Sequence, residues 1–141
     1  MTENTNQTSI DAEKVKSCWL KIKSAKGTDF FVNDFYRLLF KRHPEVQRLF
    51  PDDLIKQKSK LLNMLDNVIN GIEYIDELED VLIELGKHHK DIGITEETYA
   101  TFITTVIEAA NTSSAYQLSK DELDAWEDAF RKVSNIMLKA Y

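Results

Sequence analysis

The sequence predicts an all-α fold, and three observations lead to that prediction. Apolar residues recur at intervals of three and four along nearly every segment, which is the spacing of an amphipathic helix. No segment alternates apolar and polar residues in the way a half-buried strand does. Only four glycines and two prolines occur among the 141 residues, so long stretches contain no helix breaker. At this length we expect one domain built around one core.

Composition and charge exclude several classes of protein. The net charge of −6 and the pI near 5.1 argue against nucleic acid as a partner, because phosphate binding requires a basic surface. No apolar run is long enough to cross a membrane, and no signal peptide is visible. The single cysteine, Cys18, cannot form an internal disulfide, which favours a reducing cytoplasm. Residues 1–8 are polar and predict a disordered tail before a folded domain at 9–141.

The first two expected helices meet at Gly27. Ser9 can cap the first helix, and Thr28 can cap the second. Tyr36 lies among apolar neighbours on the second helix, and its hydroxyl needs a partner if it is buried. The alternative, and the commoner case, is a tyrosine whose hydroxyl reaches water at the surface. The apolar stripes comprise Ala12, Val15, Trp19 and Ile22, then Phe31, Phe35, Leu38 and Leu39.

A proline corner separates the second helix from the next long one. Pro44 can open a short helix that ends at Leu49-Phe50, and the following helix starts at Pro51-Asp52-Asp53. Gln57 falls on the apolar stripe of this helix, where a buried amide requires an explanation. The alternative is that Gln57 lies close enough to the helix start to reach water. The stripe itself is Leu54, Leu61, Leu65, Val68 and Ile72.

A histidine ends the apolar stripe of the next helix, which we expect from about Asp76. Leu78, Leu82, Leu85 and His89 recur at intervals of four, three and four, and Gly93 marks the turn that follows. An imidazole in this position is either a hydrogen-bonded core histidine or a ligand. The adjacent His88 lies about 100° round the helix and should face solvent, with Glu84 as its partner. A zinc site at His88 and His89 is disfavoured because neighbouring side chains on a helix point apart.

Two more helices complete the chain. Thr95-Glu96-Glu97 caps one of them, and a capping box of Ser119 and Glu122 opens the last, which runs to the end of the sequence. Residues 111–118 are expected to form a polar loop between the two. The apolar stripes are Tyr99, Phe102, Ile103, Val106 and Ala110, then Leu123, Trp126, Phe130, Val133 and Met137.

Four patterns, in the same order along nearly the whole chain, resemble the globin family. They are Val15-x-x-x-Trp19-x-x-Ile22, Phe35-Tyr36-x-x-Leu39-Phe40-x-x-x-Pro44-x-x-x-x-Leu49-Phe50, Leu85-Gly86-x-x-His89-x-x-x-Gly93-Ile94 and Ala125-Trp126-x-x-x-Phe130. The resemblance is to single-domain bacterial globins and to the globin domain of flavohaemoglobins. It implies the globin fold, a three-over-three helical sandwich around haem b.

The resemblance also implies a role for individual residues. His89 would bind the haem iron, and Tyr36 and Gln57 would form the distal pocket. A slip of one turn would bring Lys60 or Asp53 closer in place of Gln57. The remaining haem contacts implied are Phe50, Leu61, Leu85, Ile94 and Tyr99.

The function implied is reversible binding of dioxygen and other diatomic ligands such as NO and CO, for transport, storage or scavenging. NO detoxification with a separate reductase is a further expectation, although whether the protein is an enzyme stays open. Flavohaemoglobins place a glutamate late in the last helix, near the proximal histidine, whereas no acid follows Asp128 here and Tyr141 lies near that place. This departure argues against self-sufficient NO dioxygenation. The alternative is a haem-free, globin-like sensor or interaction module.

Overall fold

A computed structural model describes residues 10–50, 52–112 and 114–141 of the chain. Every regular element in these ranges is a helix, so the expected all-α fold is confirmed. None of these helices is long and apolar enough to cross a membrane. The elements are α2 (Ala12–Ala25), α3 (Thr28–Arg42), η1 (Pro44–Leu49), α4 (Leu54–Asn70), η2 (Ile72–Leu78), α5 (Glu79–Asp91), α6 (Glu96–Thr112), η3 (Ser114–Tyr116), α7 (Lys120–Met137) and η4 (Leu138–Ala140).

Helix caps agree with the sequence in two places and differ in two. The cap expected at Thr95 is confirmed, because its Oγ1 accepts from the Thr98 backbone N–H at the start of α6. The capping box that opens α7 is confirmed, because Ser119 Oγ accepts from the Glu122 backbone N–H while the Glu122 carboxylate accepts from that of Ser119. Helix α2 is capped by Asp11, and Ser9 lies outside the described residues. The expected cap at Thr28 is wrong. Gly27, with φ +85°, makes the turn, so Thr28 is already inside α3.

Three boundaries also differ from the sequence prediction. Asp53 caps α4 from outside its first turn, and Pro51 lies outside the described residues. A 3₁₀ segment, η2, precedes α5, so the helix expected from about Asp76 starts at Glu79. The predicted polar loop at 111–118 is wrong in part, because α6 continues to Thr112 and the Tyr116 ring is buried.

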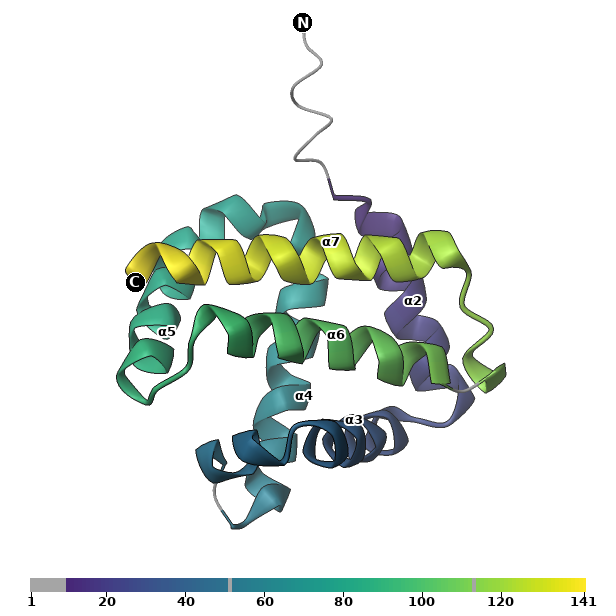
Figure 1. The fold of residues 1–141 in the computed structure, drawn as a ribbon. Coiled ribbons are helices and arrows are strands. Elements are labelled where there is room, and N and C mark those ends of the chain that lie inside the picture. The colour runs from purple at the N-terminus through teal and green to yellow at the C-terminus, as the bar shows by residue number, and fades with distance from the viewer. Residues whose placement is uncertain (1–9, 51, 113) are drawn as a thin grey trace, which may run out of the picture.

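The long helices surround the core in crossing layers. Helices α6 and α7 run side by side across Figure 1, and α4 passes behind α6. Helix α7 also packs against α2 near its start and against α5 near its end, while α3 packs against α6 and α4. The final residues, in η4, lie next to α5 (Figure 1).

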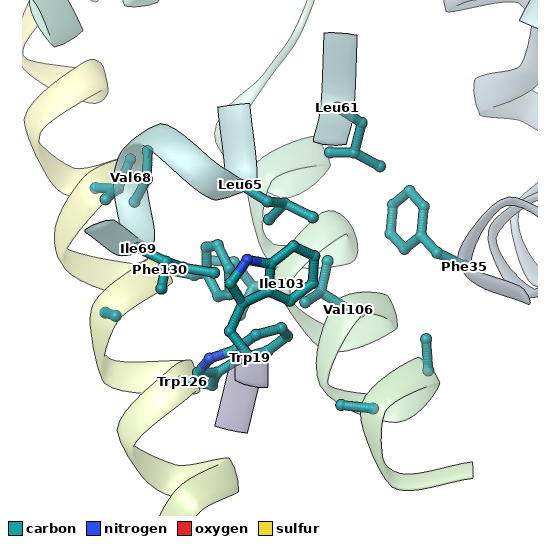
Figure 2. Packing of buried hydrophobic residues seen from close by; sticks show 14 of the residues in the cluster. Trp19, Phe35, Leu61, Leu65, Val68, Ile69, Ile103, Val106, Trp126 and Phe130 are labelled. Carbon is teal, nitrogen blue, oxygen red and sulfur yellow. The ribbon is translucent and has the colours of Figure 1, made fainter. Parts of the chain in front are cut away.

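One end of the interior is filled by Trp19, Phe31 and Trp126, which we call the aromatic core. Their ring centroids lie 5.8–6.0 Å apart, and Figure 2 shows the two indoles next to each other with aliphatic side chains around them. Both indole N–H groups donate hydrogen bonds, Trp19 to Asp66 and Trp126 to the Val15 carbonyl. Cys18 is fully buried nearby, and burial raises the pKa of its thiol, which makes it a structural cysteine.

Gly86 allows α5 to approach α7 closely. A Cβ atom at this position would lie 2.2 Å from the backbone oxygen of Met137, so no larger residue fits without movement of the backbone. This contact holds the end of α5 against the end of α7, and thereby sets the position of His89, three residues further on.

Candidate functional site

A cavity of about 490 Å³ lies between α3, α4, α5, α6 and α7, and most of its wall is apolar. Its volume falls in the range of small-molecule and cofactor sites. The structure brings together on its wall all the residues that the sequence singled out. They are Tyr36, Phe50, Gln57, Leu61, Leu85, His89, Ile94 and Tyr99.

On the α5 side of the cavity, His89 is a half-buried imidazole with one nitrogen already bonded. Its Nδ1 lies 3.2 Å from the hydroxyl oxygen of Tyr99 on α6. Burial lowers the pKa of His89, and the neighbouring His88 lowers it further, so the neutral ring is favoured. A neutral imidazole with Nδ1 engaged keeps Nε2 for a metal ion.

The Tyr99 hydroxyl continues a line of hydrogen bonds toward the end of the chain. Its oxygen lies 3.4 Å from that of Tyr141, and the Tyr141 hydroxyl donates to the Ile94 carbonyl at 2.7 Å. Burial raises the pKa of Tyr99, and the bond to Tyr141 raises it further, so Tyr99 keeps its proton at neutral pH.

A second polar group reaches the cavity from α3 and α4. Tyr36 is 4% exposed, so the surface alternative for this tyrosine is wrong. Burial raises the pKa of Tyr36 to about 12, although a hydrogen bond with the Gln57 side chain acts in the opposite direction. The Gln57 side chain therefore interacts with the Tyr36 hydroxyl, whereas the alternative had it reach only water. The Phe50 ring packs edge-on against Tyr36, with their centroids 5.6 Å apart.

The residues named as alternatives to Gln57 and His89 are more exposed or have other partners. Lys60 and His88 are exposed side chains that also line the cavity, whereas Asp53 accepts the Ile55 N–H at the start of α4. Glu84, suggested as a partner for His88, instead accepts from Lys87 at 3.1 Å. No cluster of three or more His, Cys, Asp or Glu side chains that could hold a metal occurs among the described residues.

Some cavity residues were not singled out by sequence reasoning. The apolar ones, Met64, Phe102 and Met137 among them, lie on stripes that predict only a helix face directed inward. Tyr141 does not line the cavity, and its hydrogen bond had no local signal, because its hydroxyl donates to a carbonyl 47 positions earlier in the chain. Only the resemblance placed Tyr141 near the proximal histidine.

Comparison with known proteins identifies the family. The family model described as Globin matches residues 33–137, which is most of the chain. The chain belongs to the globin family. It is therefore a haem-binding protein, and the cavity fits that cofactor. The wall is mainly apolar, His89 offers a neutral imidazole, and Tyr36 and Gln57 are the polar groups on α3 and α4.

Individual relatives agree with this assignment. A flavohemoprotein of Bacillus cereus is 28% identical over 130 residues, covering 89% of this chain and 31% of the relative. A flavohemoprotein of Halalkalibacterium halodurans is 24% identical over 118 residues, covering 82% of this chain and 29% of the relative. The chain thus spans less than a third of each of these two relatives.

Among solved structures, a bacterial globin from Campylobacter jejuni superimposes with a TM-score of 0.76 at 22% identity, and the match covers 92% of each chain. This similarity shows that the helices have the globin arrangement, as the sequence predicted.

Proposed function

We propose that this globin binds haem b, with His89 as the only protein ligand on iron, and that it binds dioxygen reversibly beside Tyr36 and Gln57. Bound haem supplies a ferrous iron that accepts small diatomic ligands, NO and CO included. The observation that carries the proposal is the single cavity shared by a neutral imidazole from α5 and a hydrogen-bonded Tyr–Gln pair from α3 and α4.

Tyr36 and Gln57 give the pocket its preference for a polar ligand. The raised pKa of Tyr36 keeps its hydroxyl protonated, so it can donate to a ligand that carries partial negative charge. Gln57 bonds the same hydroxyl and also carries an amide donor. A hydrogen bond to a charged group is worth about 1.5–3 kcal/mol, which corresponds to roughly 10- to 150-fold in ligand release.

The apolar part of the wall excludes water and holds the flat cofactor. Phe50 packs against Tyr36, and Leu61 lines the same cavity, as do Leu85 and Ile94, which flank His89 in sequence. We assign them to packing against the macrocycle. The role that follows is dioxygen binding, storage or scavenging, in the cytoplasm.

NO dioxygenation is a second candidate function, which the similarity to flavohemoproteins suggests. The reaction consumes one electron for each NO converted to nitrate, so a reductase must supply electrons to this domain. In an assay with NADH and a flavin reductase, sustained NO consumption would support this role, and loss of activity after a single turnover would contradict it.

Replacement of each of the two adjacent histidines tests the proposal. His89→Ala should abolish the Soret band of a five-coordinate, histidine-ligated ferrous haem, because no other imidazole lines that part of the cavity except the exposed His88. His88→Ala is the matched control and should keep the spectrum. A normal spectrum in His89→Ala would contradict the assignment. Purified protein that takes up no haem at all would favour the haem-free sensor or interaction module.

A further inference from the structure

A series of aromatic rings connects the cavity with the aromatic core. Phe130 on α7 lines the cavity, and its ring centroid lies 5.3 Å from that of Trp126, one helical turn earlier. The Trp126 ring lies 5.9 Å from that of Trp19 on α2, and Figure 2 shows both indoles close to the Phe130 ring. Both indoles are buried. The path from the cavity through Phe130 to the second indole therefore stays inside the protein.

The two indoles differ in the groups that accept their N–H protons. Trp126 Nε1 donates to the Val15 backbone carbonyl at 3.0 Å, whereas Trp19 Nε1 donates to the Asp66 carboxylate at 2.7 Å. Either acceptor satisfies a buried N–H donor, so packing alone does not require a carboxylate. Of the two acceptors, only the carboxylate is a base that can take the proton from the ring.

This difference decides where a one-electron oxidation would come to rest. Loss of one electron turns an indole into a radical cation, whose N–H proton is strongly acidic. At Trp126 the carbonyl cannot take that proton, so a positive charge would remain in an apolar interior, which is unfavourable. At Trp19 the proton can move along the existing hydrogen bond to Asp66 and leave a neutral radical. Trp19 is therefore the more stable site of oxidation.

The surroundings of Trp19 also favour the neutral radical over the cation. The Lys23 ammonium lies 5.6 Å from the centre of the Trp19 ring and would repel a positive charge there. The same ammonium lies 3.9 Å from the Asp66 oxygen that accepts the indole N–H. The Asp66 side chain is 45% exposed, so this end of the path reaches the surface, where a dissolved reductant can approach.

The tyrosine on the α3 side of the cavity has no base beside it. The Tyr36 hydroxyl is bonded to the Gln57 side chain, and an amide does not accept a proton at neutral pH. Burial raises the pKa of Tyr36 to about 12, so its proton is firmly held. Tyr99, which contacts His89, is the competing site of oxidation and is distinguished by the experiment below.

We propose that Trp126 and Trp19, with Asp66 as proton acceptor, form a tryptophan relay that carries oxidising equivalents from the cavity to the surface. The oxidant is hydrogen peroxide that reacts at bound haem, so the inference rests on the proposed function. In each transfer one electron passes from Trp19 through Trp126 to the cavity, and the Trp19 Nε1 proton moves to Asp66.

A small soluble reductant of the ascorbate class then completes the cycle. It returns one electron to Trp19, and the proton on Asp66 goes back to the indole nitrogen. Two such cycles deliver two electrons, which together with two protons from water reduce one hydrogen peroxide to two water molecules. Each reductant molecule is oxidised by one electron, and both relay groups end in their initial state.

The experiment adds hydrogen peroxide to the haem-loaded ferric protein at neutral pH and records the radical by freeze-quench electron paramagnetic resonance. Haem uptake is read beforehand from the Soret band. The unmodified protein should give the spectrum of a neutral tryptophan radical, and peptide mapping should find oxidation at Trp19 more than at Trp126. Ascorbate added before freezing should remove the signal.

Asp66→Asn tests the proton acceptor, because it keeps an oxygen beside Trp19 and removes the base. The neutral tryptophan radical should be lost in this variant, and oxidation should move to tyrosine. Asp76→Asn is the matched control, since Asp76 is also an exposed carboxylate paired with a lysine, Lys132. It should give the radical of the unmodified protein. Trp126→Phe should lower the yield of oxidised Trp19, because phenylalanine is far harder to oxidise than tryptophan.

The results separate the relay from haem binding. A radical confined to tyrosine in the unmodified protein, or a Trp19 radical unaffected by Asp66→Asn, would overturn the relay and leave the proposed function standing. An unchanged yield at Trp19 in Trp126→Phe would overturn the route through Trp126. Protein that takes up no haem would refute the proposed function, and the relay would fail with it because no oxidant forms in the cavity.

Discussion

The two ends of this helical interior use aromatic residues in opposite ways. In the aromatic core, Phe31 packs edge to face against Trp19 and Trp126, and both indole N–H groups find partners within the protein. At the cavity, Tyr36 and Tyr99 form part of the wall, and about 490 Å³ of space lies between the helices. The same helical periodicity therefore gives a filled interior at one end and a binding site at the other.

The difference indicates which residues serve stability and which serve ligand binding. A ring that fills space contributes through buried area and dispersion, whereas a ring beside a cavity contributes little packing on its open face. Substitutions at the two ends should therefore separate the free energy of unfolding from ligand kinetics.

The largest effect on stability is expected at the aromatic core. Trp19→Ala should lower the free energy of unfolding by about 3–5 kcal/mol, because it leaves a cavity and removes the hydrogen bond to Asp66. Urea titration of the apo-protein measures the change. Leu20→Ala, at a position 62% exposed, is the control and should have almost no effect. An equal loss of unfolding free energy in both variants would contradict the assignment of the aromatic core as the tightly packed end of the interior.

The largest effect on ligand kinetics is expected at Tyr36. Tyr36→Phe should speed dioxygen release by about one to two orders of magnitude, from the loss of one hydrogen bond of about 1.5–3 kcal/mol. Gln57→Leu should do less alone and more when Tyr36 is already replaced, because the glutamine side chain is flexible. Stopped-flow measurements on the single and double variants test this.

Carbon monoxide provides the internal control for the Tyr36 prediction. It is less polar when bound, so its release should respond far more weakly than that of dioxygen. Similar changes for both ligands would mean that the two side chains control access sterically, and the hydrogen-bonding account would fail.

A smaller, pH-dependent effect is expected at Glu122, at the start of α7. Burial pulls the pKa of this carboxyl upward, but bonds from the Ser119 backbone, Lys21 and Ser17 lower it to about 2. Since the pKa is lower in the folded state, the stabilisation is complete above about pH 4.5 and is lost as the pH falls toward 2. Glu122→Gln should cost about 1–2 kcal/mol at pH 7.

The difference between unmodified protein and Glu122→Gln should disappear between pH 4.5 and 2, as measured by urea titration across that interval. Dioxygen release should be the same in both at neutral pH, because Glu122 lies away from the cavity. A difference in stability that persists unchanged at pH 2 would contradict the assigned pKa.

The smallest effect is expected on peroxide chemistry. The hydroxyl groups behind His89, those of Tyr99 and Tyr141, are uncharged, so peroxidase turnover of the haem-loaded protein should be low beside that of a flavohaemoglobin globin domain. Tyr141→Glu places a carboxylate near Tyr99 and should raise turnover modestly. High turnover in the unmodified protein would count against a weakly donating histidine.

The sequence by itself determined the helices and the inward direction of their apolar stripes, and it marked His89 as a candidate ligand. These depend on periodicity and on local chemistry, as the capping box of Ser119 and Glu122 illustrates. It also marked Tyr36 and Gln57 as polar residues on apolar faces. Local pattern predicted less accurately the features that depend on neighbouring elements. Examples are the start of α3 at Gly27 and the burial of Tyr116.

The tertiary structure alone decided which of these residues meet. Gly86 is informative only once Met137 lies against it, and Tyr141 becomes a partner of Tyr99, which contacts His89, only when the last helix packs along α5. The physical reason is that periodicity records which face of a helix is buried, whereas hydrogen bonds between side chains far apart in sequence depend on how the helices cross. The line from His89 through Tyr99 to Tyr141 is therefore a property of the packing of α5, α6 and α7.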